Sequence, residues 1–337
     1  MTVEAARRIR QARLPEGYEL RIVDAHHHFW DLDGDGHWPW IQDEYNEDFF
    51  LGDYNAMRRT FLPREYLAET AGWDIVATVH CEAERSRSEQ VAEDDFLQRL
   101  SDATGGRLPI AAVAHVGFLQ PDRDEVLAAH AQRPIVRGIR SKPVIARRAG
   151  DSATGTGTLH DPQWVEGIAA LAAHGFSWDL RVPYYHLSEA ADVLADFPEL
   201  PVVVNHCGLP LDRSDEGLRL WRDGMERLAA LPRTVVKVSE LGLHRNRWDR
   251  PSNEVVVRDT LAIFGADRAL FASNLPVATL TAADFDEVMD TILAGAADLD
   301  ADGLDALFHR TAARVYRLDL SSPATESPAT AALSEDH

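Results

Sequence analysis

Three consecutive histidines are the local feature best suited to chemistry. The run His26-His27-His28 directly follows Leu20–Ala25, a short segment whose composition is typical of a buried strand. In an extended chain alternate side chains point to the same side, so His26 and His28 can converge on one point while His27 faces away. Neutral imidazoles there could bind a divalent cation, and imidazole N–H groups could polarise a carbonyl. Ordinary packing remains the alternative for a His-x-His pattern taken alone.

Further ionisable residues end other short β-rich runs. His80 and Glu82 follow the run that begins at Ile75, His206 follows three valines, and Glu240 follows a seventh run. His206 could instead be a core histidine, and Glu82 and Glu240 could be rim carboxylates. We interpret His206 as a catalytic candidate and Glu240 as a possible general base.

A third group of side chains is suited to binding a polar ligand. Arg140 and Lys142 supply two cations for a carboxylate or an oxyanion, and Arg140 could bind it through two hydrogen bonds. For Arg181, at the end of the next run, an ion pair with an acidic residue on the surface is an equally good explanation. The remaining candidates for substrate binding are Trp30, His80, Asp179, Arg181, Tyr184, Tyr185 and His186.

The elements that must position these residues form a repeated pattern. Eight candidate strands cover Leu20–Ala25, Ile75–His80, Pro109–Val116, Ile135–Arg140, Phe176–Arg181, Pro201–His206, Thr234–Ser239 and Ala269–Asn274. Segments with helical spacing lie between them, including Asp161–His174, Leu187–Phe197, Glu216–Ala230 and Ser252–Phe264. Strand–helix alternation indicates a parallel sheet with right-handed crossovers, and eight units predict an α/β fold of the (β/α)₈ TIM barrel type. A barrel collects functional groups at the carboxyl ends of its strands.

An open, doubly wound sheet is the alternative architecture. It predicts a glycine-rich phosphate turn after the first strand, where this chain has the three histidines followed by Phe29 and Trp30. The long segment from Phe29 to about Phe61 is rich in aromatic residues and is interpreted as a lid over the barrel mouth. Its aromatics could instead serve only their own packing. We divide the chain into an N-terminal extension (1–19), the barrel (20–318) and a disordered tail (319–337).

Composition excludes several classes of function. The 337 residues carry 34 basic and 55 acidic side chains, a formal net charge of −21, which argues against nucleic-acid or anionic-membrane partners. Cys81 and Cys207 have the spacing of neither a disulfide framework nor a thiolate metal site, and a nucleophilic role is not favoured because each neighbouring histidine points the other way. Without a signal-peptide pattern or a membrane-length apolar run, we expect a cytoplasmic monomer or homodimer that acts on a small molecule.

Taken together, these motifs resemble one known family. The stretches at residues 23–31, 80–84, 137–143, 205–210 and 271–277 are similar to those of the amidohydrolase superfamily, in the amidohydrolase-related branch that includes L-fuconolactonase and pyrone-dicarboxylate lactonase. The resemblance covers about Leu20 to Leu318. It implies hydrolysis of a lactone or a related ester or amide, with His26, His28 and His206 around the reacting carbonyl, and these three as the ligands if a metal is bound.

One position departs from the family pattern. The superfamily ends its last strand with an Asp that ligates metal or acts as general base, whereas this chain has Asn274. An amide accepts no proton near neutral pH, so Glu82 or Glu240 must supply the base while Asn274 binds substrate or water. The loss of an anionic ligand also weakens a metal site, which leaves a metal-free site and a single zinc ion as equal alternatives.

Two rival functions therefore stay open beside a lactonase. The barrel could catalyse a non-hydrolytic reaction, namely lactone isomerisation, decarboxylation or C–C bond cleavage, and Asn274 motivates this possibility. It could also be a catalytically silent barrel retained for binding.

Overall fold

The protein folds as the predicted (β/α)₈ barrel. In the computed structural model, which describes residues 14–43, 45–245 and 248–321, eight parallel strands pair in the order β1 to β8. Their bounds are β1 Arg21–His27, β2 Asp74–Cys81, β3 Ala111–His115, β4 Val136–Arg140, β5 Ser177–Leu180, β6 Val202–Val204, β7 Thr234–Val238 and β8 Ala269–Phe271. Every predicted strand overlaps an observed one, so the strand–helix alternation was sufficient to identify the fold class.

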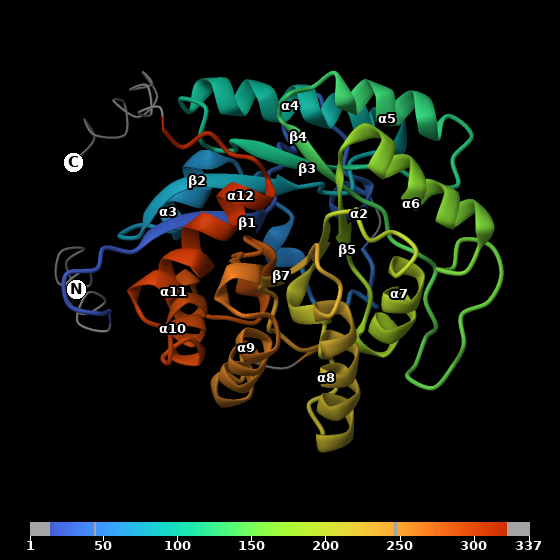
Figure 1. The fold of residues 1–337 in the computed structure, drawn as a ribbon. Helices are drawn as coiled ribbons and strands as arrows, with labels where there is room; N and C mark the ends of the chain where they lie inside the picture. Colours follow the sequence, from blue (N-terminus) through green and yellow to red (C-terminus); the bar gives the residue numbers. More distant parts are fainter. Residues whose placement is uncertain (1–13, 44, 246–247, 322–337) are drawn as a thin grey trace.

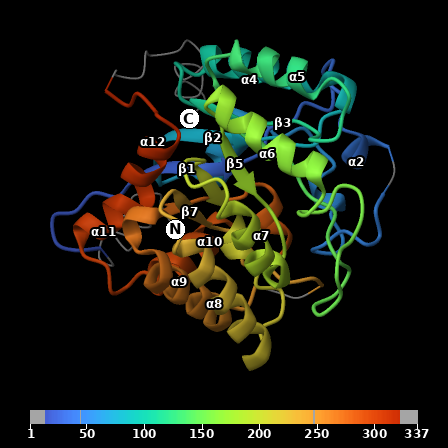
Figure 2. The same cartoon turned by 45° about the vertical axis from the view of Figure 1, so that its right-hand side comes forward.

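The helices surround the strands, as Figures 1 and 2 show from two directions. Those between or after the strands are α3 Pro63–Glu69, α4 Gln90–Ala103, α5 Arg123–Ala131, α6 Pro162–His174, α7 Leu187–Leu194, α8 Asp215–Ala229, α9 Arg250–Phe264 and α10 Phe285–Gly295. Shorter helices are α2 Pro39–Gln42, α11 Ala301–Asp305 and α12 Thr311–Val315. Among the described residues, no helix is both long enough and apolar enough to cross a membrane.

Local sequence signals explain why α6 lies close to its predicted range. The Asp161 carboxylate accepts a hydrogen bond from the Gln163 amide at the N-terminus, and Pro162 occupies the first helical position. At the other end Gly175 adopts the left-handed conformation, with φ of 72°, that ends the helix without a steric penalty. These signals place both ends of the helix from sequence alone.

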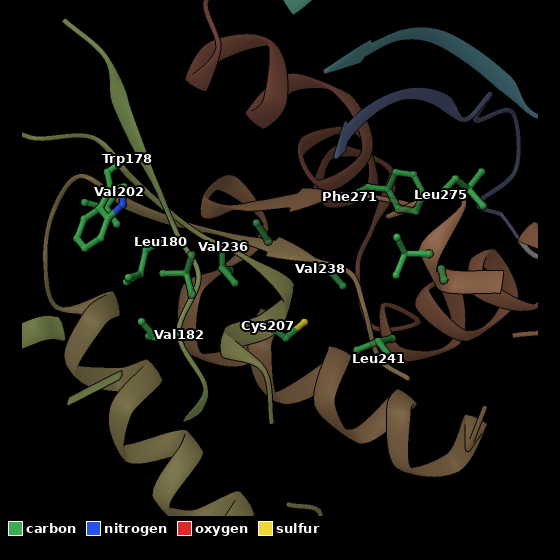
Figure 3. Packing of buried hydrophobic residues seen from close by; sticks show 14 of the residues in the cluster. Trp178, Leu180, Val182, Val202, Cys207, Val236, Val238, Leu241, Phe271 and Leu275 are labelled. Atoms are coloured by element: carbon green, nitrogen blue, oxygen red, sulfur yellow. The ribbon is translucent and has the colours of Figure 1, made fainter. Parts of the chain in front are cut away.

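Alternation along the strands divides the apolar core into two parts. Val202, Val204, Val236 and Val238 face the layer between strands and helices, part of which Figure 3 shows with Trp178 and Phe271. Val203 and Val235 belong instead to a second cluster, which also contains Val79, Ala111 and Leu270. Because successive strand residues point to opposite sides, this second cluster fills the barrel interior.

The barrel closes between β1 and β8 through the chain next to the histidine run. The Asn274 amide donates to the His26 carbonyl over 2.7 Å, and the His28 amide donates to the Leu275 carbonyl over 2.9 Å. The buried Asp24 carboxylate accepts hydrogen bonds from the Ser273 amide (2.8 Å) and the Tyr66 hydroxyl (2.7 Å). This network fixes the direction in which the residues after β1 and β8 leave the barrel.

Several predicted strands extend past the observed ends, and the difference lies at the candidate site. Residues His206, Glu240 and Asn274 follow β6, β7 and β8 with φ values of 58°, 45° and 56°. The left-handed region is unfavourable for residues with a Cβ atom and is concentrated at functional sites. The chain therefore turns sharply here, a change that β propensity does not reveal.

The long segment after β1 covers the barrel mouth. Its residues Trp30 and Phe61 pair through two backbone hydrogen bonds, Trp30 N to Phe61 O (3.0 Å) and Phe61 N to Trp30 O (2.9 Å). The two ends of the segment therefore lie side by side. Residues 1–13 and 322–337, which hold most of the predicted extension and tail, lie outside the described residues.

Candidate active site at the barrel mouth

A cavity of about 360 Å³ lies at the carboxyl ends of the strands. Its lining combines residues after the strands with residues of the aromatic segment: His28, Trp40, Asn46, Asp48, Phe49, Phe50, Tyr54, Glu82, Ala83, Glu84, Arg140, Lys142, Arg181, His206, Asn274 and Val277. The volume suits a small molecule, and the mixture of aromatic walls with a few polar groups is typical of a ligand site.

The three expected histidines gather at one end of this cavity. The His26 ring centre lies 5.0 Å from that of His28 and 4.6 Å from that of His206, while His27 points elsewhere and binds Thr78 Oγ1 over 2.8 Å. Only His28 and His206 line the cavity, because His26 is fully buried behind them. Burial, and then the nearby charge of Lys237, holds the pKa of His26 well below its usual range.

The other two imidazoles are neutral for the same reason. Burial, and next the Arg140 charge, lowers the pKa of His28 to about 3. Burial, and next the Arg181 charge, holds the pKa of His206 well below its usual range. All three therefore act near pH 7 as neutral hydrogen-bonding groups.

His28 differs from the expectation that it polarises a carbonyl. Its Nδ1 lies 2.7 Å from the Cys81 carbonyl oxygen, which can only accept, so Nδ1 carries the proton. Nε2 then has a lone pair and cannot donate to a substrate oxygen. Sequence could not show this, because the tautomer depends on which backbone group meets the ring.

Glu240 and Asn274 form a hydrogen-bonded pair beside His28. The Asn274 side chain bonds Glu240 Oε2 and places Oδ1 3.2 Å from His28 Nε2. Glu240 does not line the cavity itself; it lies behind Asn274, and its Oε1 has no hydrogen-bond partner among the described residues. Burial raises the pKa of Glu240 to about 7, against the opposing effect of the Asn274 hydrogen bond. Rotation of the amide would let Asn274 donate a hydrogen bond to His28 Nε2 and accept a hydrogen bond from the hydroxyl of protonated Glu240.

Glu82, the other candidate base, is committed to an ion pair. Arg140 donates to Glu82 Oε1 and to the Glu82 carbonyl oxygen, each over 2.7 Å. Burial alone would raise the pKa of Glu82, but the Arg140 and Lys142 charges outweigh burial and hold the pKa well below its usual range. Such a carboxylate is a poor general base near neutral pH.

The same contacts change the expected role of the two cations. Arg140 is neutralised by Glu82, and Lys142 forms an ion pair with Glu84. Both cations line the cavity, yet their charge is largely compensated before any ligand enters. The assignment of these two residues to a substrate carboxylate stays a prediction.

Arg181 is the cation that the cavity leaves uncompensated. Its guanidinium lies 5.0 Å from the centre of the Phe50 ring, and no hydrogen bond or ion pair engages it among the described residues. Burial, and then the charge of Arg140, lowers its pKa. An anionic group of a ligand would relieve both effects, so Arg181 is the better candidate for a carboxylate.

Three residues expected to bind substrate do not line the cavity. His80 points to the opposite side of β2 from Cys81, and its Nδ1 accepts a hydrogen bond from the Phe29 amide over 3.1 Å. Asp179 is buried inside the barrel. Trp30 lies behind His28, with its ring 6.4 Å from the imidazole and its Nε1 donating to the Arg59 carbonyl over 2.6 Å.

The aromatic run after β5 also lies outside the cavity lining. Tyr184, Tyr185 and His186 form a short helical turn before α7, and two of them, Tyr185 and His186, contact a neighbouring loop. The Tyr185 hydroxyl donates to the Ala146 carbonyl over 3.0 Å, and His186 Nε2 accepts from the Ala146 amide over 2.9 Å. These side chains hold the loop in place.

Sequence reasoning missed one buried cation and several cavity residues. Lys237 lies in the middle of β7 and is fully buried, and a lysine among valines in Thr-Val-Val-Lys-Val was a readable signal. Glu84 and the polar pair Asn46 and Asp48 carry no spacing that could have identified them. They reach the cavity only because their loops fold over it.

Two groups of residues are candidates for binding a metal ion, and the surroundings of both groups disfavour a divalent cation. His26, Cys81 and Asp179 place potential ligand atoms within 4.8 Å of one another, but the Lys237 ammonium lies 2.5 Å from Asp179 Oδ1 and 3.3 Å from His26 Nδ1. A divalent cation there would meet a cation already in place. In the second group, His26, His28 and His206, the neutral amide of Asn274 lies beside His28, and the carboxylate of Glu240 is already bonded to that amide.

Comparison with known proteins agrees with the fold. An amidohydrolase family model matches residues 23–318. An uncharacterized protein of Sinorhizobium fredii is 31% identical over 303 residues, which cover 89% of this chain and 99% of that protein. An L-fucono-1,5-lactonase of Burkholderia multivorans is 28% identical over 308 residues, 88% of this chain and 96% of the lactonase.

Two crystal structures of an amidohydrolase are similar to this chain. An amidohydrolase from Burkholderia multivorans with bound HEPES superposes with a TM-score of 0.72 at 27% identity, covering 89% of this chain and all of that one. A second crystal form of that amidohydrolase, with bound zinc, has a TM-score of 0.72 at 26% identity and the same coverage. Since the family model spans most of the chain, this protein belongs to the amidohydrolase family.

Proposed function

We propose that this protein is a lactonase-type hydrolase that opens a small, oxygen-rich, carboxylated lactone. The observation that carries the proposal is the arrangement at one end of the cavity, where neutral imidazoles lie beside Asn274 and Asn274 is hydrogen-bonded to Glu240, whose pKa is about 7. A base with a pKa near the working pH, beside neutral hydrogen-bond donors, suits attack of water on a carbonyl. The L-fucono-1,5-lactonase relatives support a lactone as the substrate class.

In the proposed reaction a water oxygen attacks the lactone carbonyl carbon and its proton passes to Glu240. The hydroxyl of Ser239 lies 2.9 Å from His206 Nδ1; by donating to it, Ser239 leaves Nε2–H free for the carbonyl oxygen. The lone pair of His28 Nε2 accepts a hydrogen bond from the water or from a substrate hydroxyl. The ring C–O bond then breaks, and the leaving oxygen takes the proton back from Glu240.

Turnover in ¹⁸O-labelled water tests hydrolysis directly. We would offer aldono-1,5-lactones and aldarolactones, which carry a further carboxylate, and follow ring opening with the spontaneous reaction subtracted. Hydrolysis places one labelled oxygen in the product carboxylate. A product without label would favour the isomerase or decarboxylase alternative that Asn274 motivates, and absence of turnover on the whole panel would favour a silent barrel.

The change Arg181→Gln is expected to weaken binding of the carboxylated substrates. Loss of a charge-assisted hydrogen bond to a carboxylate costs about 1.5–3 kcal/mol, so KM should rise on the order of 10- to 100-fold for aldarolactones. The KM for the uncharged aldonolactones should stay nearly the same. Arg64→Gln is the matched control, because that side chain is 79% exposed and distant from the cavity lining. Equal effects on both substrate classes would contradict the assignment.

A further inference from the structure

Lys237 makes its contacts inside the barrel, below the histidines. It alternates along β7 with Val236 and Val238, which face the helices, so its side chain points inward with that of Val235. Its ammonium lies 2.5 Å from Asp179 Oδ1 and 3.3 Å from His26 Nδ1. Asp179 also accepts hydrogen bonds from Asn205 Nδ2 over 2.9 Å and from the Tyr316 hydroxyl over 3.3 Å. The buried charge is thus paired and held in place.

The contact between Lys237 Nζ and His26 Nδ1 determines the tautomer of His26, because only one of the two atoms can donate the hydrogen bond. A lysine ammonium has three donors and no acceptor, so the imidazole nitrogen that faces it must carry a lone pair. A neutral imidazole with a lone pair on Nδ1 has its proton on Nε2. His26 Nε2 is buried without a hydrogen-bond partner among the described residues, in a ring that packs against His28 and His206. The proton on Nε2 leaves that nitrogen without a lone pair for a metal ion.

His28 has the opposite tautomer, because its Nδ1 donates to the Cys81 carbonyl. The two Nε2 atoms of the His-x-His pair therefore differ: that of His26 carries a proton, and that of His28 has a lone pair. A metal ion bound between the two rings would require lone pairs on both Nε2 atoms.

We propose that Lys237 is a positioning residue that fixes His26 as the Nε2–H tautomer, so that His26 Nε2 has no lone pair with which to bind zinc. The ion pair with Asp179 keeps the Lys237 ammonium beside His26 Nδ1. The tautomer and the low zinc affinity do not depend on which substrate the enzyme takes.

The tautomer can be measured in the wild-type protein. Two-bond ¹H–¹⁵N correlation spectra of protein labelled with ¹⁵N in histidine distinguish a protonated ring nitrogen from one with a lone pair, and His26→Gln assigns the signals. We expect a neutral His26 with its proton on Nε2. A proton on Nδ1 would overturn the proposal, whatever the activity of the protein.

A double variant tests the causal role of the lysine. Lys237→Met with Asp179→Asn removes both charges of the buried pair, so neither partner is left uncompensated. We expect His26 to lose its single tautomer and zinc affinity to rise about 10- to 100-fold. Zinc per chain, measured by elemental analysis after equilibration and gel filtration, is the readout besides activity.

The matched control removes an ion pair outside the site. Arg222→Met with Asp259→Asn breaks a 2.7 Å contact between α8 and α9 and should change neither zinc content nor tautomer. If the Lys237 variant keeps the His26 tautomer and the zinc affinity of wild type, the proposal is wrong. If those two readouts change as expected but no lactone is hydrolysed by wild type, the proposed function fails and the role of Lys237 stands.

Discussion

Replacing Glu240 by Gln is expected to lower kcat for lactone opening by about 10²- to 10⁴-fold, the range typical of a lost general base. Glutamine preserves the size of the side chain and can still bond Asn274, but it cannot take a proton from water. Steady-state turnover of the best lactone of the panel measures the effect. Glu199→Gln, at a side chain that is 87% exposed, is the matched control and should retain wild-type kcat.

The pH dependence gives this prediction a second, independent readout. Only ionised Glu240 can act as the base, and its pKa is about 7, so kcat/KM of wild type should rise with pH and level off above that value. Glu240→Gln should lose this rising limb. Glu82 does not account for such a limb, because the Arg140 and Lys142 charges keep the pKa of its carboxyl well below its usual range. A residual limb near pH 7 in the variant would assign the base to another group.

The second large effect is expected at His206. Replacing His206 by Asn should reduce turnover by at least about 100-fold, the scale of losing one oxyanion donor, because Nε2–H would no longer meet the carbonyl oxygen. The loss should lie mainly in kcat, because the interaction strengthens as negative charge develops on that oxygen.

A histidine elsewhere on the surface provides the comparison for these variants. His160 is 63% exposed and pairs with Glu189, so His160→Asn should leave kcat and KM at wild-type values. Thermal unfolding of each variant separates loss of fold from loss of chemistry. Full turnover by folded His206→Asn protein would remove this residue from the mechanism.

Several candidate residues illustrate the limit of reading strand ends from sequence. His26, His28 and His206 do meet, because parallel strands of a barrel end at one mouth and alternate residues share a side. His80 satisfied the same pattern, yet it points outward on β2 and bonds the backbone of Phe29. A one-residue difference in alternation moves a side chain to the other face, and a strand boundary read from composition is not that accurate.

The eight-strand alternation, the long aromatic segment and the set of polar residues after the strands were determined by the sequence itself, because each depends on neighbours close in the chain. Tertiary structure alone decided the pairings: Arg140 with Glu82, Lys142 with Glu84, and Lys237 with Asp179 and His26. Those pairs join residues on different strands or directly after them, so register and burial select each partner. The same contacts determine which groups are charged, which imidazole nitrogen holds a proton and which cation remains for a ligand.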